Sequence, residues 1–358
     1  MAFGRGGCSA TLCPAMRHSA PSPSARANSR KTALISGVTG QDGAYLAEHL
    51  LSHGYRVVGT SRDAVAGRFG GLDRLGIRDA VEMVTMSLVD FRSTMQVISR
   101  VEPDEIYNLA GQTSVGVSFE QPVETFDSIV VGTINLLETI KMLGRPIRLY
   151  NAGSSEMFGN TGGQPANEET ILRPRSPYAI AKATSFWQIA QYREAYGIHA
   201  CTGILFNHES PLRSERFVTQ KVVAAACRIA RGEQQKMTLG DLSVCRDWGW
   251  APEYVEAMHR MLTAAMPADY VIATGFTSSL EDFVAEVFSS LGLDWRDHVE
   301  HDPALMRPTE IVCGKADPSR AAERLGWQAR YCMPDVARLM VEARLAAEGG
   351  SPATRRAA

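Results

Sequence analysis

Three glycines in one short turn constrain the fold of this chain more than any other feature. Gly37, Gly40 and Gly43 follow an apolar run at 32–35 and precede a helical pattern at 44–53. Glycines at this spacing let backbone N–H groups approach a pyrophosphate, and the N-terminus of the helix adds a favourable dipole. A strand, a glycine turn and a helix in this order predict a dinucleotide-binding α/β fold, with these glycines as cofactor-binding residues.

The rest of the first 210 residues repeats this alternation of strands and helices. Short apolar runs predict strands, and longer stretches with helical periodicity lie between them. This alternation is typical of a doubly wound (Rossmann) parallel sheet that helices cover on both faces. The strands are expected at 56–59, 105–109, 147–151 and 201–205, and the main helices at 133–142 and 178–196.

Beyond residue 210 the pattern becomes less regular and predicts a smaller, mixed α/β C-terminal lobe that binds the substrate. Residues 31–210 are therefore expected to form mainly the cofactor domain, and residues 211–348 mainly the substrate lobe, with some elements interleaved. Helices are expected at 218–231, 252–266, 280–291 and 334–348, and short strands near 237–239 and 270–273.

Composition excludes several classes of protein. The chain has 358 residues and a net charge of -2 without a dense basic run, which disfavours nucleic acid or an anionic membrane as its partner. No apolar stretch is long enough to span a bilayer. The 7 cysteines are scattered and odd in number, so we expect free thiols, no metal site and a cytoplasmic location.

The two ends of the chain differ from the rest. Residues 1–30 are rich in Ser, Ala, Pro and Gly and carry four arginines and no acid: Arg5, Arg17, Arg26 and Arg30. An organelle transit peptide has a similar composition, but a disordered extension, or a true start at Met16, explains the segment more simply. The tail at 349–358 is also expected to be disordered.

Four polar residues form the candidate catalytic set. Tyr178 and Lys182 are four residues apart on an expected helix and so share one face, where the ammonium should lower the tyrosine pKa. The phenolate could then take a proton from a hydroxyl group. Ser154 and Glu156 follow the strand expected at 147–151, and ligands of open α/β sheets bind beyond that end. Ser154 could hydrogen-bond the substrate, and Glu156 could remove a proton α to a ketone. The set therefore predicts oxidation followed by dehydration.

The end of the second strand bears on the choice of cofactor. Arg62 offers a positive charge where NADP carries its 2′-phosphate, which favours NADP. Asp63 follows directly and would repel that phosphate, so NAD is not excluded.

From about residue 31 to 331 the chain resembles the extended short-chain dehydrogenase/reductases, and within that group the GDP-mannose 4,6-dehydratases. The resemblance rests on short segments, of which GQDG inside the glycine turn and NHESP are the most specific. The segments are 37–43 (GVTGQDG), 108–112 (NLAGQ), 154–159 (SSEMFG), 174–178 (PRSPY), 206–211 (FNHESP), 246–249 (RDWG) and 307–310 (RPTE).

The resemblance implies a reaction and further site residues. GDP-mannose would be oxidised at C4, would lose a C5 proton to Glu156 and water from C6, and would regain the hydride at C6 to give GDP-4-keto-6-deoxymannose. It also implies a homodimer or homotetramer. Cofactor contacts would include Thr39, Gln41, Asp42, Leu109 and His208, and the GDP part of the substrate would meet Asn207, Lys221, Arg246, Arg307 and Glu310.

Two other functions stay open from the sequence alone. A nucleotide-sugar reductase or epimerase, or a dehydratase for another sugar nucleotide, would keep Tyr178 and Lys182, although the reductase and the epimerase have no need of Glu156. A non-catalytic nucleotide-binding protein is the third possibility, against which the complete catalytic set argues.

Overall fold

A seven-stranded, entirely parallel sheet forms the centre of the computed structural model, which describes residues 30–305 and 309–349. The strand order is β10-β6-β5-β4-β1-β2-β3, so the winding direction reverses between β1 and β4. Ligands of such sheets bind outside the carboxyl ends of the strands at this reversal. The strands are β1 (Thr32–Ser36), β2 (Arg56–Ser61), β3 (Glu82–Thr85), β4 (Glu105–Asn108), β5 (Arg148–Ala152), β6 (Ala200–Leu205) and β10 (Tyr270–Ile272).

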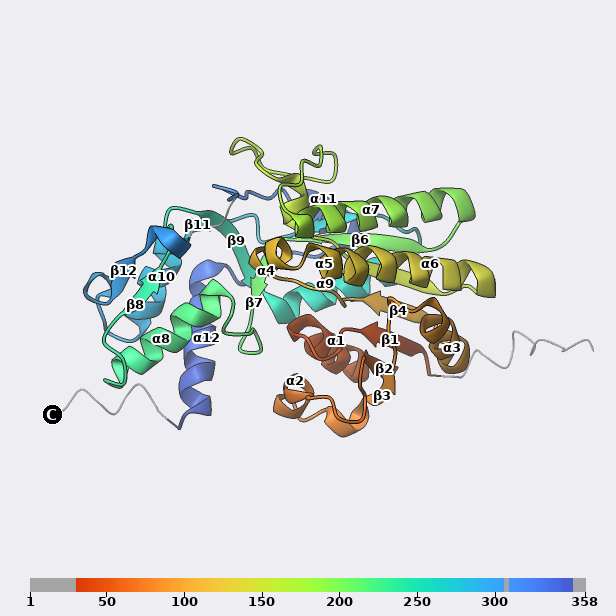
Figure 1. The fold of residues 1–358 in the computed structure, drawn as a ribbon, viewed down its shortest axis with the longest axis horizontal. Helices are drawn as coiled ribbons and strands as arrows, with labels where there is room; N and C mark the ends of the chain where they lie inside the picture. The colour runs from red at the N-terminus through yellow and green to blue at the C-terminus, as the bar shows by residue number, and fades with distance from the viewer. Residues whose placement is uncertain (1–29, 306–308, 350–358) are drawn as a thin grey trace, which may run out of the picture. The chain divides into compact units, whose positions relative to one another are not determined.

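Helices cover both faces of this sheet (Figure 1). Side chains alternate along β1, so that Ala33 and Ile35 pack against α1 and α9 while Leu34 packs against α3, α6 and α7. A strand buried on both faces is mostly apolar, which explains Ala33, Leu34 and Ile35. The helices around the sheet are α1 (Gln41–Ser52), α2 (Gly70–Arg74), α3 (Phe91–Val101), α4 (Val115–Glu120), α5 (Pro122–Phe126), α6 (Gly132–Leu143), α7 (Pro177–Tyr196), α9 (Ala251–Thr263) and α11 (Ser319–Leu325).

The remaining elements build a smaller α/β layer with its own apolar core, in which Trp248, Phe283 and Phe288 are buried. A three-stranded sheet has the order β11-β9-β7, and β12 pairs with β8. A capping box between Ser279 and Asp282 begins α10. These elements are β7 (Asn207–Glu209), α8 (Val218–Ala230), β8 (Met237–Leu239), β9 (Cys245–Trp250), β11 (Thr277–Ser279), α10 (Leu280–Ser290), β12 (Val299–His301) and α12 (Met333–Ala347).

The predicted fold class is confirmed, with two local corrections. The strand expected near 270–273 in the smaller lobe is β10, an edge strand of the central sheet, paired with β6. The helix expected at 252–266 ends at Thr263. Its end is fixed because the Arg148 guanidinium donates to the carbonyls of Leu262 (2.9 Å) and Ala264 (3.3 Å).

The chain termini and the cysteines were also the subject of predictions. The extension at 1–29 and the tail at 350–358 lie outside the described residues. Cys201, Cys227, Cys245, Cys313 and Cys332 are free thiols. In the part of the chain that the structure describes, no helix combines the length and the apolar character needed to cross a membrane.

Candidate active site

Ser154 and Glu156 lie directly beyond the carboxyl end of β5. Gly153 brings the chain close to β6, where its N–H donates to the Gly203 carbonyl at 2.8 Å and a Cβ would lie 2.7 Å from Thr202 Cγ2. Ser154 then caps a short 3₁₀ turn, Ser155–Phe158, and its Oγ accepts a hydrogen bond from the Glu156 N–H at 3.3 Å. Both side chains are thereby held at the edge of the sheet where ligands bind.

Tyr178 and Lys182 come from the first turns of α7. Ser176 caps this helix by accepting from the Ala179 N–H at 3.1 Å, and Pro177 occupies the first helical position. The Tyr178 hydroxyl is hydrogen-bonded to Ser154, and Lys182 Nζ lies 5.8 Å from the centroid of the Tyr178 ring. Lys182 Nζ also donates to the Ala152 carbonyl at 2.7 Å. The structure therefore brings all four predicted catalytic residues together.

Burial controls the protonation of Tyr178 and Lys182. It raises the pKa of Tyr178 to about 12, against the hydrogen bond from Ser154, which lowers it. Burial also lowers the pKa of Lys182 to about 8, against the nearby Asp42 carboxylate. The expected lowering of the Tyr178 pKa is therefore wrong for this structure, because desolvation of the phenolate outweighs the Ser154 hydrogen bond and the charge of Arg213, which lower this pKa.

A cavity of about 430 Å³ separates the carboxyl ends of the central strands from the smaller layer. Three of the four predicted catalytic residues line it together with predicted substrate residues, while Lys182 is not among the described lining residues. Arg307 lies outside the described residues. The predicted residues that line the cavity are Ser154, Glu156, Tyr178, Asn207, Lys221, Arg246 and Glu310, together with Asp42 and His208.

Two cationic side chains on the substrate side are held by hydrogen bonds within the protein. Arg246 is only 11% exposed and donates to Glu310 Oε1 and to the Ile311 carbonyl, each at 2.7 Å. Lys221 Nζ donates to the Thr238 carbonyl at 2.9 Å. Preorganised cations beside a cavity suit an anionic group such as a diphosphate.

The glycine turn has the shape that a pyrophosphate requires. Gly37 has φ +84°, and a Cβ there would lie 2.8 Å from the Ala110 nitrogen. A Cβ on Gly43 would lie 2.3 Å from the Gly37 carbonyl oxygen. Gly40 caps α1 without a side-chain hydrogen bond, so the first N–H groups of α1 point beyond the exposed Thr39 and Gly40. The turn therefore fits a dinucleotide.

Three further residues predicted as cofactor contacts join this turn to β7 through internal hydrogen bonds. Asp42 Oδ2 lies 3.0 Å from His208 Nε2, and Gln41 Nε2 donates to the His208 carbonyl at 3.1 Å. Burial raises the Asp42 pKa, but the His208 charge and hydrogen bond outweigh it and bring that pKa down to about 2. Burial lowers the His208 pKa, but the charge and hydrogen bond of Asp42 have a larger effect, so the His208 pKa is raised overall. His208 is thus a buried partner of Asp42 whose ring stacks on Tyr254.

Arg62 and Asp63 follow β2 at the surface. Arg62 is exposed, while Asp63 Oδ1 accepts from the N–H groups of Val65 (2.9 Å) and Ala66 (2.8 Å), which lower its pKa. The Asp63 carboxylate therefore closes a local turn and keeps its negative charge. The Leu109 N–H donates to the Ser36 carbonyl at 3.0 Å, which places this residue next to the glycine turn.

The sequence reasoning missed a buried charged group at the cavity. Glu209 is 2% exposed, lies 3.2 Å from Arg213 Nε, and accepts from Thr219 Oγ1 at 2.8 Å. Arg213 lines the cavity and stacks 3.7 Å from the centroid of the Phe217 ring. The signal was available, because a glutamate in a buried strand needs a partner and an arginine follows four residues later.

The strand order, the glycine turn and the Ser154–Tyr178–Lys182 group define a Rossmann-fold enzyme of the extended short-chain dehydrogenase/reductase class. The fold agrees with the dTDP-glucose 4,6-dehydratase of Bacillus anthracis in complex with NAD (TM-score 0.77, 19% identity, 89% of this chain and 98% of that chain). It also agrees with RMD from Pseudomonas aeruginosa complexed with NADPH (TM-score 0.72, 21% identity, 87% and 98%). At these identities the likeness shows the fold alone.

Sequence comparison identifies the family within this class. The profile described as GDP-mannose 4,6 dehydratase matches residues 34–340. GDP-mannose 4,6 dehydratase 1 of Arabidopsis thaliana is 44% identical over 323 residues, which cover 87% of this chain and 89% of that protein. The chain belongs to the GDP-mannose 4,6-dehydratase family.

Proposed function

We propose that this protein converts GDP-mannose to GDP-4-keto-6-deoxymannose by removing one molecule of water. The observation that carries the proposal is the position of Glu156. Its carboxylate lines the same cavity as Tyr178, and Ser154 is hydrogen-bonded to Tyr178 and to the Glu156 N–H. An enzyme that only oxidises or reduces an alcohol has no use for a second proton acceptor at this place. The names of the relatives support the same reaction.

The chain's own residues supply the proton transfers. Tyr178 takes the proton of the C4 hydroxyl, and Ser154 hydrogen-bonds the same oxygen as it becomes a ketone. The ketone acidifies the neighbouring C5–H, and Glu156 removes that proton. Glu156 then returns the proton to the C6 hydroxyl, which leaves as water, so that one residue acts first as base and then as acid. Once C6 has regained the hydride, C5 takes up a proton and Tyr178 releases the one that it took from the C4 hydroxyl, so both side chains return to their starting state.

A nicotinamide dinucleotide, when bound, supplies the hydride acceptor for C4 and the hydride donor for C6. Gly37, Gly40 and the first N–H groups of α1 would hold its pyrophosphate, and Lys182 would hold its nicotinamide ribose. We propose NADP as the preferred form, because Arg62 is exposed just after β2, where its positive charge can meet the 2′-phosphate.

The cofactor preference has a direct test. Titration of the protein with NADP and with NAD should give tighter binding of NADP. Arg62→Ala should weaken NADP roughly tenfold or more, since a charged hydrogen bond contributes about 1.5–3 kcal/mol, and should leave NAD binding unchanged. Equal losses for both cofactors would refute the assignment of Arg62 to the 2′-phosphate.

We assign the GDP part of the substrate to the smaller layer. Arg246 and Lys221 are the cations that support this assignment, with Asn207 and Glu310 beside them. Arg307 is included on its resemblance to the family motif. In this proposal residues 31–210 serve mainly the cofactor and residues 211–348 mainly the sugar nucleotide.

We also propose a cytoplasmic homodimer or homotetramer. The free thiols support a reducing compartment. Support for self-association comes from apolar side chains exposed on the neighbouring helices α5 and α7, among them Val123 (72%), Ile180 (43%) and Trp187 (61%). Sedimentation of the wild type and of Trp187→Glu should show a smaller species for the variant, and an unchanged species would argue against this surface.

The test of the main proposal is incubation with GDP-mannose and cofactor, followed by mass spectrometry of the product. Loss of one water and a new 4-keto group are the expected result. An unchanged mass with inversion at one carbon would indicate an epimerase, and a net gain of two hydrogens would indicate a reductase. If neither cofactor binding nor turnover is found, the chain is a non-catalytic protein.

A further inference from the structure

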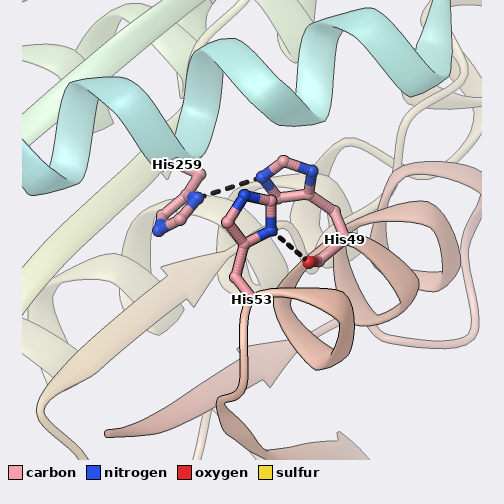
Figure 2. Close-up of side chains that lie close together, drawn as sticks. All are labelled: His49, His53 and His259. Carbon is pink, nitrogen blue, oxygen red and sulfur yellow. Dashed lines mark hydrogen bonds between the residues drawn. The ribbon is translucent and has the colours of Figure 1, made fainter.

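Three histidines converge where the last turn of α1 meets α9 (Figure 2). His49 lies in the last turn of α1, His53 ends that helix, and His259 lies near the end of α9. None of the three is among the described residues that line the cavity. One ring nitrogen from each lies within 4.8 Å of the others. The group joins two helices whose residues are 210 positions apart.

The hydrogen bonds around the rings direct two nitrogen lone pairs toward one point. His53 Nδ1 donates to the His49 carbonyl at 2.8 Å, and because a carbonyl only accepts, His53 Nε2 carries no proton in the neutral ring. Figure 2 shows this second nitrogen turned toward the other two rings.

His259 is oriented by a second, longer chain of contacts. The Tyr55 hydroxyl donates to the buried carboxylate of Glu105 at 3.1 Å, so its oxygen accepts from His259 Nε2 at 3.2 Å. His259 Nδ1 is then unprotonated and faces His49 Nε2 at 3.0 Å. A ligating histidine characteristically gives its other N–H to a carbonyl or to a carboxylate network, and two of these three rings already do so.

The distances suit a small transition-metal ion. Two nitrogens that bind one Zn²⁺ at 2.0–2.1 Å in tetrahedral geometry are about 3.3 Å apart. The His49–His259 pair at 3.0 Å is close to this value, and the exposed His53 ring can close the remaining gap by rotation. The carbonyl end of α1 and the Glu105 carboxylate also favour a positive charge here.

We propose that His49, His53 and His259 form a binding site for a borderline transition-metal ion, with Zn²⁺ as the best-suited one. Imidazole ligands suit Zn, Cu and Ni rather than Mg or Ca, and three histidines leave the fourth position to water. The ion would fasten the end of α1 to α9 and thereby hold the two helices that pack together on one face of the sheet. This site is independent of the proposed dehydration, because it does not touch the cavity.

The test uses tag-free protein that has been stripped with a chelator and titrated with ZnCl₂ by calorimetry and with CoCl₂ by visible absorption. One ion per chain is expected, with the intense absorption of tetrahedral Co²⁺. His53→Ala should weaken binding by more than about 100-fold, which exceeds the 10–100-fold cost of losing an outer partner alone. The matched control is His301→Ala, which removes another exposed histidine outside the group.

Thermal unfolding separates a lost site from a damaged protein. Zn²⁺ should raise the unfolding midpoint of the wild type and of His301→Ala, and should leave that of His53→Ala unchanged, while the three midpoints without metal agree. His53 is exposed, so its replacement leaves the core intact. If the wild type binds no Zn²⁺ or Co²⁺ at 1:1 stoichiometry, or if His53→Ala binds them as tightly, the proposal is wrong.

Discussion

Asp42 Oδ2 lies 3.0 Å from His208 Nε2, so an ion pair joins the first turn of α1 to β7 across 166 positions of the chain. Gln41 strengthens the same link through its bonds to the His208 carbonyl and, at 2.7 Å, to Ser210 Oγ. The glycine turn is therefore held in place by the strand that follows β6, and its position depends on the charge of two titratable side chains.

This link predicts a defined pH dependence of stability. The pKa of Asp42 is lowered to about 2, so this residue stabilises the fold fully at pH values above its ordinary pKa of 3.8. That stabilisation is lost as the pH falls toward 2. The pKa of His208 is raised above its ordinary value of 6.5, so this residue stabilises the fold fully at pH values below 6.5. That stabilisation is lost as the pH rises through the raised pKa. Asp42→Asn should therefore cost about 1.5–3 kcal/mol of unfolding free energy at pH 6 and less at pH 9. Urea unfolding at both pH values measures this difference. The exposed Asp63→Asn is the control, and a cost that does not change with pH would contradict the prediction.

Glu156→Gln should stop elimination while leaving the first oxidation possible. The amide keeps the shape of the side chain but cannot take the C5 proton, so turnover should fall by roughly two to four powers of ten. In heavy water the wild type should incorporate deuterium at C5, and the variant should not. Glu169→Gln, on an exposed loop, should behave as the wild type. Full turnover by Glu156→Gln would remove the basis for assigning the base.

Gly43→Ala should destabilise the fold and weaken cofactor binding together. The new Cβ would lie 2.3 Å from the Gly37 oxygen and 2.6 Å from Val38 Cα, so the turn itself must move. A cost of about 1–3 kcal/mol is expected, the usual effect of overpacking. Gly70→Ala provides the comparison, because its Cβ meets nothing within 4 Å and should leave stability equal or slightly higher. Denaturant midpoints and cofactor titrations measure the two effects. Equal stability and equal cofactor affinity of Gly43→Ala and Gly70→Ala would contradict the prediction.

Arg246→Gln should raise KM for the sugar nucleotide with little change in kcat. Its guanidinium is held at the cavity by Glu310 and the Ile311 carbonyl, and in the proposed arrangement it contacts the diphosphate of the substrate and no reacting carbon. Loss of a charged hydrogen bond of about 1.5–3 kcal/mol corresponds to roughly a 10- to 150-fold rise. Steady-state kinetics with Arg296→Gln as the exposed control tests this. A fall in kcat at constant KM would place Arg246 in the chemical step instead.

The central fold was predictable because its signals are local. The glycine turn lies between a buried strand and a helix, and the four-residue spacing of Tyr178 and Lys182 places both on one face of α7. The amphipathic stripe of α3, with Thr94, Val97 and Ile98 buried, is a further local signal of a helix in the sequence. The edge strand β3 was harder to predict, because only Val84 is buried in it.

The parts that could not be predicted depend on contacts between distant residues. β9 contains Asp247, a residue that strands disfavour, and tertiary bonds from the N–H groups of Thr274 (3.0 Å) and Gly275 (2.7 Å) hold it there. Burial nevertheless raises the pKa of Asp247 to about 6. The direction of the Tyr178 pKa shift also depends on desolvation, which no local pattern encodes. The meeting of His49 with His259 is a third case: His53 lies four residues after His49, but no local pattern indicates that His259 approaches them.

Ser154 is hydrogen-bonded to Tyr178 on α7 and accepts from the backbone of Glu156 on the turn after β5. Ser154 therefore links the Tyr178 hydroxyl to the backbone that carries Glu156, although the two proposed proton acceptors come from different parts of the fold. C4 and C5 are adjacent carbons, so a sugar bound against Ser154 can remain stationary while the reaction advances from one carbon to the next. Because the C5–H becomes acidic only after C4 has been oxidised, the chemistry itself sets the order of the steps. The substrate does not have to move between two binding positions.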